Sequence, residues 1–280
     1  MDISIRNRGI DPLYPDLKQI GFDGVDFGFP GWERREKILA EDFESTILQT
    51  YRRIADAGLQ ISQVHLTYYP GHLPPLGSGT YADFEDYMLP ILLKEIALTA
   101  KMNCHLAAIH LYFEESLEKS REGNLQLIQK LLPTLEEHGV ILAIENIFGP
   151  GFGDVHLSTA EDLLFYVDHF KSDCVGACLD TGHAVTRKQN PVEAVRKLGS
   201  ALKALHVHSN VSGHDLHMPP CMIRNVDWQK FYDALLAVGY RGAFNMEISP
   251  PAGLSQKATL AFFTLAHGIA ESLMLPKAES

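Results

Sequence analysis

Short apolar segments alternate with longer amphipathic segments along this chain. The apolar segments are typical of parallel strands buried on both faces, and they cover residues 3–6, 25–29, 61–66, 106–111, 140–146, 175–180, 204–208 and 243–248. Between and after them the pattern predicts helices at residues 12–20, 41–57, 83–103, 119–138, 158–172, 190–200, 227–238 and 255–274. Several of these helices end at a glycine, as at Gly58 and Gly139, where a left-handed conformation costs least.

Alternating strands and helices joined by short turns indicate a parallel sheet. Eight such units in 280 residues favour a single closed (β/α)8 TIM barrel over an open doubly wound sheet. No linker-like run or break in composition is visible, so we expect one domain over residues 1–280. No GxGxxG motif follows a predicted strand, and the sequence has neither a GKS or GKT phosphate loop nor a GxSxG motif.

The composition sets limits on location and partners. The net charge of −11 and the scattered basic residues disfavour a nucleic-acid partner, because a DNA-binding surface needs a basic stripe. The N-terminal residues MDISIRN lack the basic and apolar regions of a signal peptide, and no apolar run reaches the roughly 18 residues that span a bilayer. We therefore expect a cytoplasmic protein without membrane contact, whose four cysteines are reduced.

Imidazole and carboxylate side chains stand at the ends of the predicted strands or in the loops just after them. They are His65, His110, Glu145, Asp180, His183, His206, Asp215, His217 and Glu247. His208 shares a face of its strand with His206, because side chains alternate along a strand. The C-terminal ends of barrel strands meet at one mouth, where this fold places its active site. Imidazoles and carboxylates gathered there are what a divalent metal ion needs.

Each of these residues also has a simpler explanation. A buried acid such as Glu145 could pair with an arginine or lysine, although three acids at three strand ends are harder to explain in that way. His65 and His110 could be core histidines, and Asp215 and His217 could serve ordinary turn chemistry. Three aromatic residues near the second strand could wall a sugar pocket, and they are Phe27, Phe29 and Trp32.

Four segments resemble the xylose isomerase-like TIM barrels, and the likeness extends over nearly the whole chain. They read ILAIENIFGPG (141–151), ACLDTGHA (177–184), LHVHSNVSGHDLHMPP (205–220) and FNMEIS (244–249). This superfamily contains sugar isomerases and epimerases, inosose-type isomerases and dehydratases, and endonuclease IV. The resemblance implies a central metal site at Glu145, Asp180, His206 and Glu247. Such mostly oxygen ligands suit Mn²⁺ or Mg²⁺ and accept Co²⁺ or Zn²⁺.

The resemblance further implies a divalent-metal-dependent isomerase or epimerase of a sugar, sugar phosphate or related polyol ketone. Glu145 and Glu247 would be the catalytic residues, which move a proton on the carbon beside a carbonyl through a metal-stabilised enediolate. The remaining positions would contact substrate or additional metal ions, and they are His65, His110, His183, His208, Asp215 and His217. The family likeness also implies a homo-oligomer.

Two alternatives stay open at this point. A dehydratase of the inosose or dehydroshikimate type would use the same enediolate and then expel a neighbouring hydroxyl. An endonuclease IV-like phosphodiesterase would hold three zinc ions, and the positions that match its two further ions are His65, His110, His183, Asp215 and His217. The loop HMPPCMIRNVDW (217–228) departs from the H-x-P-P-G-x-G pattern of many relatives, because Cys221 replaces the first glycine. The identity of the sugar therefore does not carry over from the family.

Overall fold

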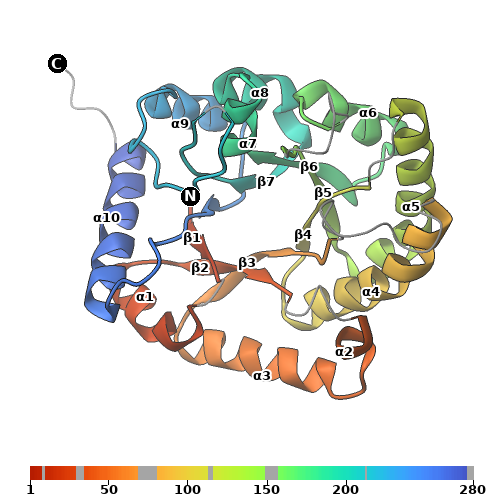
Figure 1. Cartoon of the computed structure of the whole chain (residues 1–280), viewed down its shortest axis with the longest axis horizontal. Helices are drawn as coiled ribbons and strands as arrows, with labels where there is room; N and C mark the ends of the chain where they lie inside the picture. Colours follow the sequence, from red (N-terminus) through yellow and green to blue (C-terminus); the bar gives the residue numbers. More distant parts are fainter. Residues whose placement is uncertain are drawn as a thin grey trace.

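A parallel sheet of eight strands forms the centre of the computed structural model (Figure 1). The structure describes residues 1–7, 10–29, 35–68, 81–112, 116–148, 157–211 and 213–275. The strands are β1 (Ile3–Arg6), β2 (Gly24–Gly28), β3 (Gln60–His65), β4 (Leu106–Ile109), β5 (Ile141–Glu145), β6 (Val175–Asp180), β7 (Leu202–His206) and β8 (Phe244–Met246). They are hydrogen-bonded in the order β7-β6-β5-β4-β3-β2-β1-β8.

The two end strands of this order, β7 and β8, meet just beyond the end of β7. The Val207 amide donates to the Asn245 carbonyl over 2.8 Å, and the Glu247 amide donates to the Val207 carbonyl over 3.2 Å. These bonds nearly close the sheet, which removes the long open edges that a flat sheet would expose. The predicted (β/α)8 barrel is therefore confirmed.

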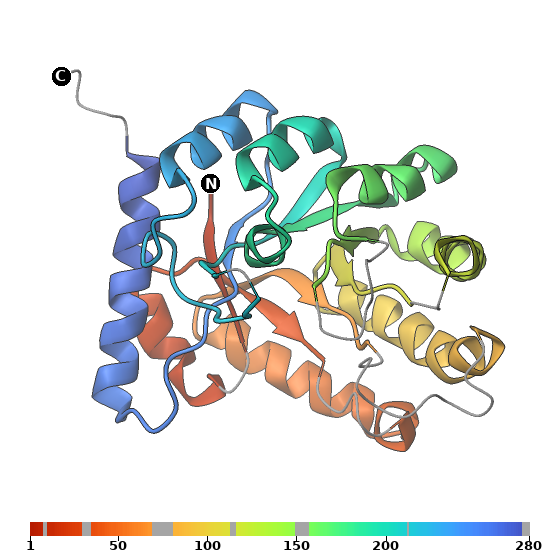
Figure 2. The same ribbon diagram turned by 45° about the horizontal axis from the view of Figure 1, so that its top comes forward.

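Helices cover the outside of the barrel, except for the short helix directly after β6, which lies at the mouth (Figures 1 and 2). They are α1 (Tyr14–Ile20), α2 (Arg35–Leu39), α3 (Phe43–Asp56), α4 (Tyr81–Lys101), α5 (Leu117–His138), α6 (Ala160–Phe170), α7 (Thr181–Thr186), α8 (Pro191–Leu198), α9 (Trp228–Ala237) and α10 (Gln256–Met274). The eight predicted helices all form, and each begins within two residues of its expected start. The short helices α2 and α7 are not predicted by the apolar pattern.

Local side-chain chemistry fixes several of these helix ends. At α6 the Thr159 hydroxyl accepts from the Asp162 amide while the Asp162 carboxylate accepts from the Thr159 amide, which is a capping box. Asn190 caps α8, with Pro191 at the first helical position. Gly139 ends α5 at a φ of 61°. These signals lie next to each other in the sequence, which is why the helix starts are predictable.

Eight inward-facing residues lie two positions before the mouth of the barrel, and we call them the floor layer. On β4 to β7 they are small, contact one another and are buried: Ala108, Ala143, Cys178 and Ala204. On β8 and β1 to β3 they are polar and equally buried: Asn245, Ser4, Asp26 and Gln63. Because alternate residues of a strand point to the same side, the floor layer lies directly beneath the residues at the mouth.

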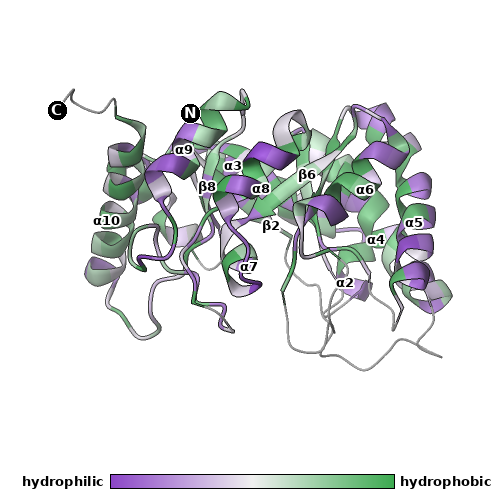
Figure 3. Ribbon diagram, turned by 90° about the horizontal axis from the view of Figure 1, so that it is seen from above, coloured by the Kyte–Doolittle hydropathy of each residue, from purple (hydrophilic) through white to green (hydrophobic). Residues whose placement is uncertain are grey.

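The helices are amphipathic, so that hydrophilic and hydrophobic residues alternate along them in the side view (Figure 3). Helix α8, for example, buries Val192, Val195 and Leu198 while Glu193 and Lys197 are exposed. An apolar stripe of this kind packs on the sheet and leaves the opposite face to water. Within the described ranges, none of the helices combines the length and the apolar character needed to cross a membrane.

Candidate metal centre

The ten side chains singled out from the sequence all belong to strand ends or to the segments that follow them. His65, Glu145, Asp180 and His206 are the last residues of β3, β5, β6 and β7. Two more directly follow β4 and β8, and they are His110 and Glu247. The others lie in α7 or in the loop between β7 and α9, and they are His183, His208, Asp215 and His217.

Glu145 is buried and is approached by four imidazoles. Its Oε2 lies 3.0 Å from Nε2 of His110 and 3.3 Å from Nε2 of His65. Its Oε1 lies 3.1 Å from Nδ1 of His206 and 3.4 Å from Nδ1 of His183. Burial raises the pKa of this carboxyl, but His206 and then His110 outweigh burial and hold the pKa well below its usual range. Glu145 is therefore ionised at neutral pH.

His206 is fully buried between the two glutamates. Its Nδ1 lies 3.1 Å from Oε1 of Glu145 and 3.1 Å from Oε2 of Glu247, yet neither ring nitrogen has a hydrogen-bond partner among the described residues. Burial lowers the pKa of this imidazole, but the neighbouring Cys178 and Glu145 outweigh burial and hold the pKa well above its usual value. An unsatisfied polar atom at such depth is costly unless another group binds it.

The donor set around His206 fits a divalent cation. Four buried residues each offer one donor atom within 4.8 Å of the others, and they are Glu145, Asp180, His206 and Glu247. Donor atoms that bind one ion at about 2.0–2.2 Å are roughly 3 Å apart. The two 3.1 Å separations at Nδ1 of His206 match that spacing. The four residues that the family resemblance implies thus lie close together, with donor atoms within 4.8 Å of one another.

The Asp180 carboxylate contacts both the start of α7 and the ring of His208. Its Oδ1 accepts from the His183 amide over 2.6 Å and so begins α7, while both carboxylate oxygens lie 3.0 Å from Nε2 of His208. Burial raises the pKa of Asp180, but His183 and then His208 lower it further than burial raises it. Asn146 ties the ends of β5 and β6 together, because its Oδ1 accepts from the Asp180 amide over 2.7 Å and its Nδ2 donates to the Asp180 carbonyl over 2.9 Å.

Further contacts connect the centre with the loop after β7. Nε2 of His217 lies 3.0 Å from Oδ2 of Asp215, and Nδ1 of the same ring lies 2.8 Å from the Glu247 carbonyl. Nε2 of His183 lies 3.9 Å from Oδ2 of Asp215. Burial raises the pKa of Asp215, but the neighbouring imidazoles of His183 and His217 lower it far below its usual range. The loop residues therefore join the same cluster as the strand ends.

The sequence analysis does not single out Arg6, which ends β1 and pairs with Oε1 of Glu247. The simpler explanation for a buried acid, an ion pair with arginine, thus holds for one oxygen of Glu247. The other oxygen, Oε2, faces His206. Arg6 could have been found by the same criterion as the other residues, because it is a charged side chain at the end of a predicted strand. It escapes a pattern that is limited to acidic residues and histidines.

Glu95 in α4 is a further buried acid that the sequence does not reveal. Its carboxylate accepts from the amide of Thr67 over 2.8 Å and lies 2.6 Å from the Thr67 hydroxyl. Thr67 follows His65 by two residues and precedes Tyr68, whose ring centroid lies 4.5 Å from that of His110. Glu95 therefore anchors the segment that leaves β3 at the mouth.

Two members of the possible aromatic wall are buried in the structure. Phe27 and Phe29 are buried in the hydrophobic core and pack edge to face with ring centroids 5.4 Å apart. Trp32, the third member, lies outside the described residues. The two phenylalanines therefore act as core residues.

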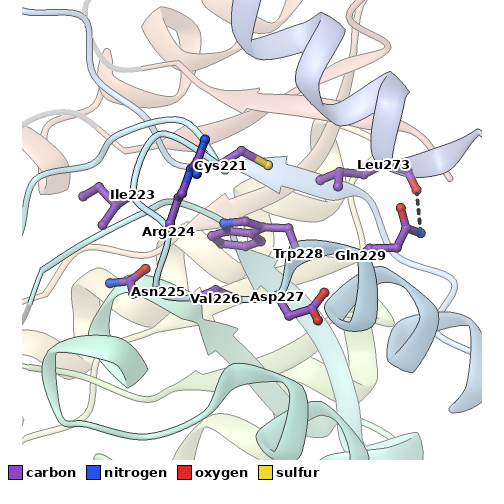
Figure 4. Close-up of a pocket in the computed structure, with 9 residues that line it drawn as sticks. All are labelled: Cys221, Ile223, Arg224, Asn225, Val226, Asp227, Trp228, Gln229 and Leu273. Atoms are coloured by element: carbon purple, nitrogen blue, oxygen red, sulfur yellow. Dashed lines mark hydrogen bonds between the residues drawn. The ribbon is translucent and has the colours of Figure 1, made fainter.

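A cavity of about 720 Å³ lies between the loop after β7, the start of α9 and Leu273 of α10 (Figure 4). Cys221, the residue that departs from the family pattern, and Trp228 belong to its lining. The ten side chains of the mouth are absent from that lining. This cavity is therefore separate from the candidate metal centre.

The comparisons with known proteins agree with the fold. The uncharacterized protein y4fM of Sinorhizobium fredii is 25% identical over 247 residues, which cover 79% of this chain and 76% of that protein. The D-psicose 3-epimerase of Enterocloster bolteae is 30% identical over 120 residues, which cover 43% of this chain and 37% of that enzyme. A crystal structure of D-psicose 3-epimerase in the presence of D-fructose has a TM-score of 0.77 at 15% identity, covering 98% of this chain and 99% of that one.

A likeness of fold at such low identity establishes the architecture, whereas the family follows from the sequence. The family model described as "Xylose isomerase-like TIM barrel" matches residues 15–264, a span that contains all ten side chains of the mouth. This chain therefore belongs to the xylose isomerase-like TIM barrel family.

Proposed function

We propose that this protein is a divalent-metal-dependent isomerase or epimerase of a sugar, a sugar phosphate or a related polyol ketone. The observation that carries the proposal is the placement of two buried glutamates, Glu145 and Glu247, each 3.1 Å from the same nitrogen of His206. Glu145, Asp180, His206 and Glu247 would hold the metal. When bound, the ion supplies positive charge that stabilises negative charge on the carbonyl and hydroxyl oxygens of the substrate.

The two glutamates would carry the proton transfer. Glu145 is ionised because the imidazoles around it depress its pKa, so its carboxylate is ready to accept a proton. One glutamate removes the proton from the carbon beside the carbonyl, which leaves an enediolate. In an epimerisation the other glutamate, protonated at the start, would give its proton to the opposite face of that carbon. In an isomerisation the glutamate that took the proton would deliver it to the neighbouring carbon.

The histidines at the mouth would orient the hydroxyl groups of the substrate. Burial, outweighing the nearby Glu145, lowers the pKa of His110 to about 4, so its ring is neutral at physiological pH. A neutral imidazole has one donor and one acceptor nitrogen and can bond to a hydroxyl in either sense. His183 and His65 flank the same carboxylate and would also contact hydroxyl groups of the substrate. The D-psicose 3-epimerase relatives support a sugar of this kind as substrate.

The test is exchange of the substrate's carbon-bound hydrogen with deuterium in D₂O, followed by NMR over a panel of ketoses with added Mn²⁺. We expect Glu145→Gln and Glu247→Gln to lower exchange by about 10²–10⁴-fold, because an amide cannot take up the proton. Glu161→Gln is the matched control, since Glu161 forms an exposed ion pair with Lys197 on the outer helices. Near-normal exchange in either of the two mouth variants would refute the two-glutamate mechanism. Analysis of the products separates isomerisation or epimerisation from a dehydratase reaction.

One observation keeps the three-ion alternative testable. His65, His110 and Glu145 form a cluster of donor atoms of their own, again within 4.8 Å of one another. We nevertheless expect one metal ion per chain, because this cluster shares Glu145 with the central four residues and the overall charge disfavours a DNA substrate. Mass spectrometry of protein purified without chelators counts the metal. Three zinc ions per chain, together with incision of an abasic-site duplex, would replace our proposal with the endonuclease IV-like one.

A further inference from the structure

A buried carboxylate lies beneath the candidate metal centre and outside its ligand set. Asp26 belongs to β2 and to the floor layer, and its side chain is fully buried. Its Oδ2 lies 3.4 Å from Nε2 of His206, whereas Nδ1 of the same ring faces Glu145 and Glu247. Asp26 and the two glutamates therefore approach different nitrogens of one imidazole.

Polar side chains from neighbouring strands hold the Asp26 carboxylate in this position. Nδ2 of Asn245 on β8 donates to Oδ2 of Asp26 over 3.0 Å, and Nε2 of Gln63 on β3 donates to the same oxygen over 3.4 Å. Oδ1 of Asn245 in turn accepts from the hydroxyl of Ser4 on β1 over 2.9 Å. The carboxylate cannot turn away from His206 without breaking bonds to two other strands.

The small residues of the floor layer cannot orient the ring in this way. On β4, β5 and β7 it consists of alanines, and Cys178 on β6 offers only a thiol, which is a weak hydrogen-bonding group. Asp26 is the one charged residue of the eight. A neutral imidazole carries a single N–H, and the acceptor that binds one nitrogen decides which nitrogen keeps its lone pair.

We propose that Asp26 is a positioning residue that fixes the tautomer of His206. In the metal-bound protein its Oδ2, which lies 3.4 Å from Nε2 here, would accept a hydrogen bond from Nε2–H, and the lone pair of Nδ1 would then be directed at the space between Glu145 and Glu247. The inference rests on the proposed metal centre, because it concerns the orientation and tautomer of His206, one of the four proposed ligands. Groups that orient a ligating histidine typically change metal affinity by about 10–100-fold when they are removed.

The experiment is a calorimetric titration of Mn²⁺ into the chelator-treated full chain, comparing the wild type with Asp26→Asn. The amide keeps the shape of the carboxylate but loses the charge and the second acceptor oxygen. We expect the dissociation constant for Mn²⁺ to rise about 10–100-fold. An unchanged constant would overturn the role of Asp26.

Ser4→Ala is the matched control, because it removes a bond of the same network without contact to His206. Its Mn²⁺ affinity should stay within about twofold of the wild type, well short of the change expected for an orienting residue. If Mn²⁺ affinity fell equally in both variants, the hydrogen-bond network would affect the metal centre only by stabilising the fold. That result would refute the proposal. A wild type that binds none of Mn²⁺, Co²⁺ and Zn²⁺ refutes the metal centre itself, whereas normal wild-type binding with an unaffected Asp26→Asn refutes only the inference.

A measurement on the wild type keeps the inference testable if Asp26→Asn does not fold. In Zn²⁺-loaded protein labelled with ¹⁵N-histidine, two-bond nitrogen–proton NMR correlations identify the protonated nitrogen of each ring. The His206 signals are assigned by their loss in His206→Gln. We expect the proton on Nε2. A proton on Nδ1 would overturn the proposal.

Discussion

At the scale of single residues, the buried acids at the mouth are surrounded mainly by imidazoles. Glu145 is approached by four of them, and Asp180 lies 3.0 Å from His208. An imidazole can give up its proton near neutral pH, so a carboxylate and its histidine can exchange that proton for a metal ion. A lysine or arginine partner would keep its charge and compete with the ion. Glu247 has both kinds of partner, because one of its oxygens pairs with Arg6 and the other faces His206.

Glu95 gives a prediction for the pH dependence of stability. Burial raises its pKa from 4.5 to about 8, against the hydrogen bonds with Thr67 that lower it. The unfolded chain therefore loses this proton near pH 4.5, while the folded protein keeps it until about pH 8. Since the native state then binds more protons, stability falls as the pH rises through this window, by at most about 1.4 kcal/mol per pH unit.

The measurement is urea unfolding of the wild type and Glu95→Gln at pH 5 and pH 8. The glutamine does not titrate, so we expect the wild type to lose a few kcal/mol relative to the variant between the two pH values. A stability difference that is the same at both pH values would show that Glu95 does not titrate in this range.

At the scale of elements, the end of β6 and the start of α7 form one unit around Asp180. The carboxylate caps α7 through the His183 amide, so the same bond that begins the helix places His183 over Glu145. Gly182 is the second residue of α7 and lies against the ring of His208. The close approach of helix and histidine leaves no room there for a larger residue.

Gly182→Ala should therefore disturb the centre although alanine favours helices. A Cβ at this position would overlap Cε1 of His208, so the ring, which contacts Asp180, has to shift. We expect a loss of about 1–3 kcal/mol in stability, as for other overpacked sites. Weaker Mn²⁺ binding should accompany it. Thermal unfolding and metal titration test both effects.

Gly268→Ala in α10 is the matched control. Among the described residues, no atom outside the helix's own backbone and the neighbouring residues lies within 4 Å of the added Cβ, and the glycine sits inside a helix. We expect a gain of about 0.5–1 kcal/mol, because alanine loses less backbone freedom on folding than glycine does. If both variants lost stability equally, the contact between Gly182 and His208 would not be the cause.

At the scale of the whole molecule, the candidate centre exists only when the barrel is closed. Its four central residues come from β5, β6, β7 and the segment after β8, and the Val207–Glu247 bond joins the last two across the seam. An unfolded chain cannot present these groups together. A metal ion therefore binds the native state and stabilises it by mass action.

We expect Mn²⁺ at about 100 times its dissociation constant to raise the free energy of unfolding by roughly 2.7 kcal/mol. Chelator treatment should reverse the gain, and Glu145→Gln should abolish most of it because Glu145 contacts both the central residues and the neighbouring histidines. Thermal unfolding with and without Mn²⁺ measures the effect, with Glu161→Gln as the surface control. An unfolding temperature that does not respond to Mn²⁺, Co²⁺ or Zn²⁺ would argue against a metal centre.

The sequence by itself determined the architecture and the positions of the mouth residues. Strand and helix periods are local, and capping signals such as Thr159 with Asp162 lie within a few residues of each other. The rule that strand ends meet at one mouth was enough to select His65, Glu145, Asp180 and His206. The resemblance to the family then selected which of these residues would bind the metal.

Only the tertiary structure decided which atoms face each other. Arg6 and Glu247, Asp26 and His206, and Glu95 and Thr67 are far apart along the chain, and no period or motif links them. Their pairing depends on the closure of the barrel, the register of its strands and the rotamers of buried side chains. These features arise from packing over the whole molecule, so a local pattern in the sequence cannot specify them.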